Sequence, residues 1–250
     1  MISSCNLRRV FLVFSLIFLT IIQVKAQLWR MRRVEFTFGA GTTYFFSDIG
    51  GYKSIGLKDL YGNQTKTNFN LNGKYRIASN VTGRFSFTYG QLGANDATGT
   101  NVSRDYECLV SFFETALIGE YYLLRNSSEK SFFYPMRNEK TLKKIKRVLD
   151  LYAFAGIGAI NYNVSSNEKF AAVINKPDGW AMVFPAGAGV SVVLSPDFSL
   201  GIEMGGRFAF SDKIDGFTSS FSHSNDIYYF LNIFLTFRKR SASSMINYRR

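Results

Sequence analysis

The chain has 250 residues, enough for one or two domains, and its 30 Lys and Arg residues against 18 Asp and Glu residues give a net charge of +12. Charged residues make up 19% and aromatic residues 16% of the composition, which excludes a disordered chain. The basic residues are scattered, so no nucleic-acid partner is expected, and one histidine with two cysteines excludes the common zinc sites.

The N-terminus predicts a secretory signal peptide. Arg8 and Arg9 form a positively charged start, residues 10–22 are apolar, and Ala26 occupies a position that signal peptidase reads. As a helix, the apolar run spans about 20 Å, which is too short for the ~30 Å core of a bilayer. We therefore expect cleavage between Ala26 and Gln27 rather than a membrane anchor.

The rest of the chain alternates apolar and polar residues with a period of two, which is the pattern of β-strands. Most of the alternating segments have about ten residues or more, whereas soluble strands usually have five or six. Ten tilted residues reach about 25 Å, the height of the apolar band of an outer-membrane barrel. Eight segments fit this pattern: residues 34–46, 69–77, 84–89, 113–123, 149–161, 182–195, 199–210 and 228–237.

Two of these segments are rich in glycine and alanine, and the facing of their side chains is harder to infer. The period alone does not assign a face when both faces carry small or apolar residues. Either face of 149–161 could therefore point outward. For 182–195 we expect an outward face made of Phe184, Val190, Val192 and Leu194.

Short and long connections alternate between the segments. Residues 78–80 and 195–197 are short and have turn chemistry, whereas the other regular connections run about 14 to 20 residues. Outer-membrane barrels have the same asymmetry, with short periplasmic turns and long outer loops. Residues 125–148 are the exception, because this long segment lies where a short periplasmic turn is expected.

A soluble barrel with an apolar interior, or a solvated sheet face, would show the same period. Here the polar face is rich in glycine and its charges balance, as a narrow lumen requires, and the apolar face carries aromatic residues near the strand ends. We therefore predict an all-β, eight-stranded antiparallel transmembrane barrel that contacts lipid and lipopolysaccharide in the outer membrane of a Gram-negative bacterium. The predicted lumen charges are Glu35, Lys74, Arg76, Arg84, Glu114, Glu120, Glu203 and Arg207.

Four stretches of the chain carry a resemblance to a known family. They are GTTYFFSDIG at 41–50, YGQLGAND at 89–96, RDYECLVSFFE at 104–114 and GGRFAFSDKID at 205–215. Together they resemble the small OmpA-like eight-stranded barrels of Bacteroidota, the group that includes the barrel subunit associated with the type IX secretion machinery. The resemblance spans residues 34–237. It implies an attachment to the secretion apparatus through the periplasmic face.

The lumen charges allow two interpretations. They could conduct ions or protons, or they could form a salt-bridged plug. Eight strands enclose an interior just wide enough for side chains, so we expect the plug. The narrow pore remains the alternative.

Two groups of residues near the predicted outer loops suggest other chemistry. Asp residues at the loop bases could bind Ca²⁺, although Asp also caps turns. His223, between two serines, is the single candidate base for a lipid A-modifying enzyme, but no acid is placed to orient it, so catalysis is not expected. The acidic residues are Asp48, Asp96, Asp105, Asp212 and Asp215.

The segment 125–148 carries eight basic and two acidic residues. It could dock on an acidic periplasmic protein, such as a component of secretion machinery, or on anionic cell-wall polymer, whereas the simpler interpretation is a solvated turn. The basic tail at 241–250 falls on the same side. The residues expected to dock are Lys140, Lys143, Lys144, Lys146 and Arg147.

These observations predict three parts: a signal peptide at 1–26, a barrel at 27–240 and a basic tail at 241–250. The expected function is that of a non-catalytic membrane anchor or interaction subunit without metal or cofactor. A narrow pore, a surface ligand-binding barrel and a lipid-modifying enzyme are the alternatives.

Overall fold

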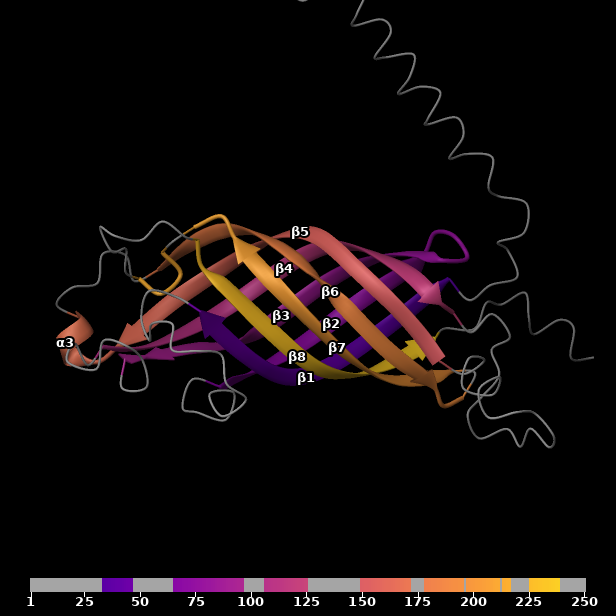
Figure 1. Ribbon diagram of the computed structural model, residues 1–250, viewed down its shortest axis with the longest axis horizontal. Coiled ribbons are helices and arrows are strands. Elements are labelled where there is room, and N and C mark those ends of the chain that lie inside the picture. The colour runs from indigo at the N-terminus through magenta and orange to yellow at the C-terminus, as the bar shows by residue number, and fades with distance from the viewer. Residues whose placement is uncertain are drawn as a thin grey trace, which may run out of the picture.

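The computed structural model describes residues 33–46, 65–96, 106–125, 149–171, 178–195, 197–211, 213–216 and 225–238. Its strands form one closed antiparallel barrel in sequence order, and β1 pairs with β8 to close it (Figure 1). The predicted fold class is therefore confirmed. The elements are β1 (Val34–Phe46), β2 (Lys66–Arg76), β3 (Val81–Asn95), β4 (Glu107–Leu124), β5 (Leu149–Ser166), α3 (Glu168–Ala171), β6 (Asp178–Val193), β7 (Phe198–Ala209) and β8 (Ile227–Arg238).

The barrel is polar inside and apolar outside. In β1, Glu35 and Thr37 are buried in the interior, whereas the alternate residues Phe36 and Phe38 are 43% and 59% exposed. Exposed apolar side chains follow the same parity on the other strands. This is the arrangement of a barrel whose outer face meets lipid, and it is the reverse of a soluble barrel. No helix in the described parts of the chain is long and apolar enough to span a membrane.

The facing of the two glycine- and alanine-rich strands follows from the burial pattern. In β6 the predicted outward face is confirmed, with Phe184 38% exposed and the residues between the outward ones buried. In β5 the aromatic residues point inward and small residues such as Ala153 and Ala155 point outward. The inward residues of β5 are Asp150, Tyr152, Phe154, Ile160, Tyr162 and Val164.

The two ends of the barrel differ. At one end, here called the turn end, β2–β3 and β6–β7 are joined by tight turns, in which Ile77 N donates to Val81 O at 3.0 Å and Leu194 N to Phe198 O at 3.0 Å. Both predicted short turns are therefore confirmed. The start of β1 and the end of β8 lie at the same end (Figure 1). The opposite end is called the loop end.

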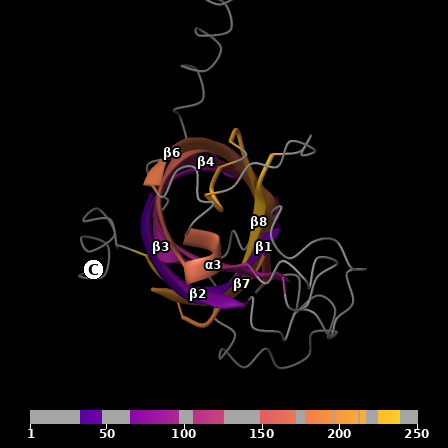
Figure 2. The same ribbon diagram turned by 90° about the vertical axis from the view of Figure 1, so that its left-hand side faces the viewer.

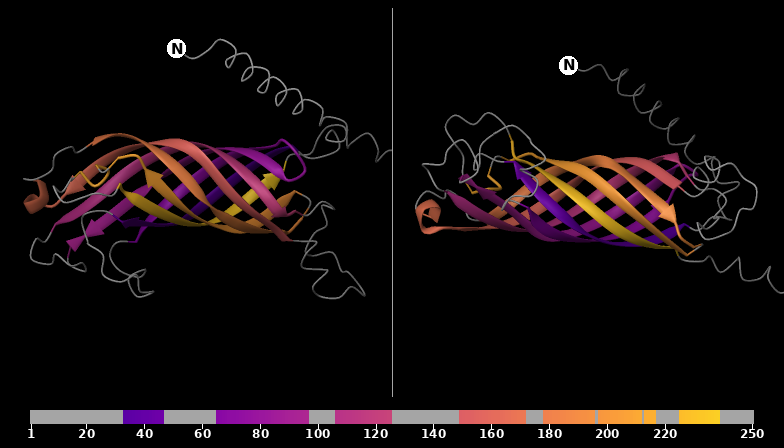
Figure 3. Two further views of the ribbon diagram at one scale, coloured as in Figure 1. Left: turned by 45° about the horizontal axis from the view of Figure 1, so that its top comes forward. Right: turned by 60° about the horizontal axis from the view of Figure 1, so that its bottom comes forward.

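At the loop end, β3 to β6 extend further than the other four strands (Figures 1 and 3). The connections β3–β4 and β5–β6 are consequently eleven residues each, shorter than expected from the sequence. In this extension the polarity reverses. Leu92, Val110 and Val164 are buried on the inner face, while Asn163 and Ser165 are exposed on the outer face. The extension is therefore built like a water-soluble sheet rather than a lipid-facing one.

Candidate functional site

The lumen is the candidate functional site, and its charged side chains form three layers from the turn end upward. The first layer centres on Glu35 of β1. Its Oε1 lies 3.6 Å from Arg76 Nη2, 3.7 Å from Arg125 Nη2 and 3.6 Å from Arg238 Nε. Arg238 also places Nη2 3.0 Å from Asp150 Oδ2 on β5. One carboxylate thus connects β1, β2, β8 and the end of β4, and a second connects β8 with β5 across the lumen.

The second layer lies in the middle of the barrel and is the most tightly paired. Glu120 Oε1 is 2.8 Å from Lys74 Nζ and 3.2 Å from Arg84 Nε. Arg84 Nη1 reaches Glu203 Oε2 at 2.6 Å. Two buried tyrosines complete the layer, because Tyr122 OH donates to Glu120 Oε2 at 2.9 Å and Tyr152 OH to Glu203 Oε2 at 2.8 Å.

The third layer joins β4, β7 and β8. Arg207 Nε lies 3.6 Å from Glu114 Oε1, and Tyr228 OH donates to Glu114 Oε2 at 2.6 Å. The Arg207 guanidinium also lies 4.0 Å from the centre of the Phe230 ring. Such cation–π packing fills the space between the charged layer and the aromatic residues above it.

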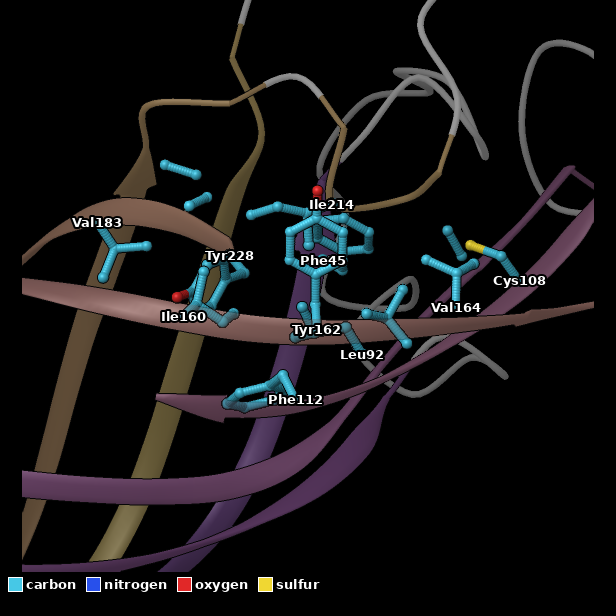
Figure 4. Close-up of a cluster of buried hydrophobic side chains, with 14 of the residues drawn as sticks. Phe45, Leu92, Cys108, Phe112, Ile160, Tyr162, Val164, Val183, Ile214 and Tyr228 are labelled. Atoms are coloured by element: carbon cyan, nitrogen blue, oxygen red, sulfur yellow. The ribbon is translucent and has the colours of Figure 1, made fainter. Parts of the chain in front are cut away.

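Above the third layer the interior becomes apolar. Phe112 and Phe230 stack with ring centres 5.6 Å apart, and Ile160 and Tyr162 are buried beside them. Figure 4 shows buried side chains from the surrounding strands gathered together with Ile214 in this part of the interior. Phe170 of α3 is fully buried in the same cluster, and α3 lies across the mouth in the end view (Figure 2). We call this cluster the apolar stopper.

One cavity of about 10 Å³ lies in the middle of the lumen, which is the size needed for about one water molecule. Amide, hydroxyl and charged groups line it, so a water there would find hydrogen-bond partners. The lining residues are Thr37, Asn70, Asn72, Lys74, Arg84, Glu203, Asn232 and Phe234.

All eight charges named from the sequence lie inside the barrel, each 9% exposed or less. Sequence reasoning missed three further members of the network. Asp150 belongs to the strand whose facing was left open, and Arg238 continues the inward alternation of β8 by one residue beyond the predicted end. Arg125 was assigned to the basic segment that follows β4. The structure corrects this, because its side chain lies in the lumen mouth, 3.9 Å from the Tyr122 ring centre.

The predicted acidic group is only partly described. Asp96 and Asp215 are buried near the loop end, and Asp96 Oδ2 accepts a hydrogen bond from Tyr106 N at 3.4 Å, as a capping residue does. Among the described residues, no three His, Cys, Asp or Glu side chains gather in a way that could hold a metal ion. The remaining predicted residues lie outside the described ones: Ala26, Gln27, Asp48, Asp105, Lys140, Lys143, Lys144, Lys146, Arg147, Asp212 and His223.

A closed eight-stranded antiparallel barrel that is apolar outside and carries buried charges inside has the architecture of a small transmembrane β-barrel. The chain belongs to the family described as "Domain of unknown function (DUF6089)", whose model matches residues 8–238. No curated protein matches the chain.

Three solved bacterial structures are similar to this chain at low sequence identity. The attachment invasion locus protein Ail of Yersinia pestis is 13% identical, with a TM-score of 0.45 over 84% of this chain and 100% of that one. Neisserial surface protein A is 11% identical, with a TM-score of 0.45 over 82% and 97%. The N-terminal barrel of Pseudomonas aeruginosa OprF is 11% identical, with a TM-score of 0.44 over 82% and 97%.

Proposed function

We propose that this protein is a non-conducting barrel of the outer membrane of a Gram-negative bacterium, acting as a membrane anchor or interaction subunit rather than as a pore or an enzyme. The observation that carries the proposal is the packing of the described interior, in which three charged layers lie below the apolar stopper. The cavity in the middle of the lumen has a volume of only about 10 Å³. A hydrated ion needs a continuous aqueous path, and paired charges and stacked rings that cross the described interior argue against one.

Conductance tests this directly. Purified protein reconstituted in a planar bilayer is expected to give no steady single-channel current above that of protein-free lipid. Circular dichroism of the same preparation verifies that the barrel is folded. Steady unitary steps from folded protein would overturn the non-conducting anchor in favour of a narrow pore.

The proposal also gives the barrel an orientation. Tight turns and both ends of the strand sequence lie at the turn end, which we assign to the periplasm because outer-membrane barrels place their short turns there. β4 ends and β5 begins at this end, and the sequence between them, 126–148, is strongly basic. We propose that it docks on an acidic periplasmic partner through Lys140, Lys143, Lys144, Lys146 and Arg147.

The family resemblance suggests a component of the type IX secretion machinery as this partner. The resemblance is the support for that choice. The test is extraction from native membranes in mild detergent, followed by mass spectrometry of co-purifying proteins. A variant with the five docking residues changed to Gln should lose a stoichiometric periplasmic partner. The matched control changes Lys53 and Lys58, in the β1–β2 connection at the loop end, to Gln and should keep it. A partner present in all three samples, or in none, contradicts docking through this segment.

A further inference from the structure

The strand register aligns outward side chains of β3 to β6 in rows that cross the barrel near the loop end. One row is Phe87, Thr115, Ala159 and Met182, which is mainly apolar. The next row, about 7 Å further along the strands, is Tyr89, Phe113, Asn161 and Trp180. The row after that is Gln91, Ser111, Asn163 and Asp178, and every member is polar.

These rows locate the edge of the lipid-facing surface. The middle row is aromatic on three of its four strands, as is typical of the interface between hydrocarbon and headgroups. Beyond it the outer face is mainly polar, with Leu109 as the exception, while the inner face becomes apolar, with Leu92 and Val110 fully buried. The polar row therefore lies beside the headgroups of the leaflet and is continuous with the surface that contacts their acyl chains.

Four side chains on β5 and β6 form a compact group at this edge. Asn161 is paired in register with Trp180, and Asn163 with Asp178, so the four occupy the corners of one patch on the outer face. The indole of Trp180 is 67% exposed, and Asn163 and Asp178 are also exposed. Asn161 Nδ2 donates to Gly179 O at 3.4 Å, which holds this amide beside the indole.

The chemistry of the patch fits a sugar better than a phosphate. An exposed indole face can pack against the C–H face of a pyranose ring, while amides and a carboxylate hydrogen-bond to its hydroxyls. Neither of the two outer rows contains a lysine or arginine, and Asp178 repels anions. We propose that Asn161, Asn163, Asp178 and Trp180 bind the sugar headgroup of a glycolipid in the surrounding leaflet. That this leaflet is the outer one rests on the orientation proposed above. The binding of the sugar headgroup does not depend on that orientation.

The fluorescence of Trp180 can report binding, because the chain has only one other tryptophan, Trp29, which can be replaced. A Trp29→Phe protein is reconstituted in phosphatidylcholine vesicles with increasing fractions of a neutral glycosyl diacylglycerol. We expect a saturable change in Trp180 emission. Vesicles with equal fractions of phosphatidylglycerol, which carries a phosphate and no sugar ring, should leave the emission unchanged.

Variants make the test specific. In the Trp29→Phe background, Asn163→Ala with Asp178→Ala should raise the half-saturating glycolipid fraction about tenfold, as expected for the loss of two hydrogen bonds. Glu107→Gln, exposed on β4 in the same extension but two rows away, is the matched control and should bind normally. Circular dichroism verifies that each variant is folded.

Three outcomes would overturn the proposal: an equal response to phosphatidylglycerol, unchanged binding in the double variant, or no response to the glycolipid. A further test adds the methyl glycoside of the same sugar, which is soluble and has no acyl chains. If it saturates the Trp180 emission change equally well, the site binds free glycans, and the proposal that its ligand is a lipid is overturned. Because both leaflets of the vesicle carry the glycolipid and no current is measured, these results do not depend on orientation or conductance. A failure here is thus distinguishable from a failure of the proposed anchor function.

Discussion

Glu35 is the acid that Arg76, Arg125 and Arg238 share, and its side chain is 4% exposed. Burying a carboxylate in the lumen removes it from water, and this desolvation cost is offset only by its attraction to the guanidinium groups. The buried arginines depend on the carboxylate for the same reason. The stability of each lumen charge therefore depends on the other charges around it. Removing any one member leaves a buried charge with fewer partners.

Glu35→Ala should lower the free energy of unfolding by about 3–5 kcal/mol, because it leaves buried guanidinium groups without their shared carboxylate. The measurement is urea unfolding of the barrel in lipid vesicles, followed by circular dichroism. The matched control is Glu107→Gln, at an exposed position, which should change stability by less than about 0.5 kcal/mol. Equal effects of the two substitutions would show that the Glu35 cluster does not hold the lumen together.

Glycines leave room for the large side chains that fill the lumen. A Cβ on Gly187 of β6 would meet the backbone of Met204 and Gly205 and lie 2.7 Å from Phe154 Cζ. Gly187→Ala should therefore destabilise the barrel by about 1–3 kcal/mol in the same unfolding experiment. Gly73→Ala is the control, because a Cβ there meets nothing within 4 Å. A loss at Gly73 as large as that at Gly187 would contradict this steric explanation.

At the scale of elements, the sequence pattern predicts a strand well where its two faces differ in polarity. β1 has that contrast and its extent was predicted closely, whereas β5 has aromatic residues inside and alanines outside, so its facing could not be inferred. The loop-end parts of β3 to β6 were assigned to loops for a related reason. Their outer faces carry Asn and Ser where a membrane strand carries apolar residues. Asp150, Arg125 and Arg238 were missed because they lie at such ambiguous strands or strand ends.

The reversed polarity of the extension predicts which part of β5 meets water. In a Cys108→Ser background, Ser165→Cys should react with a membrane-impermeant maleimide at least about tenfold faster than Ala155→Cys in vesicles, since lipid excludes the charged reagent. Both positions face outward on the same strand. Comparable rates in folded protein would show that the extension is embedded in lipid and that the rows do not mark its edge.

For the whole molecule, two kinds of packing lie in series along the described lumen: the charged layers toward the turn end and the apolar stopper toward the loop end. In the proposed non-conducting barrel, these are the two barriers to ions. Each spans the lumen with side chains from several strands. A path for ions has to cross both, so disrupting either one alone leaves the other in place. This arrangement explains why an interior with many charges is compatible with a sealed barrel.

The serial arrangement predicts how conductance responds to substitution. Phe112→Ala with Phe230→Ala thins the stopper, and Arg84→Ala with Glu203→Ala removes a partnered pair from the middle layer without leaving either charge alone. Each double variant should stay closed in a planar bilayer, because the other barrier remains. The combined variant should conduct, provided that circular dichroism shows a folded barrel. Conductance by one double variant alone would contradict two barriers in series. A folded but silent combined variant would show that opening the stopper and the middle charged layer together does not open the lumen.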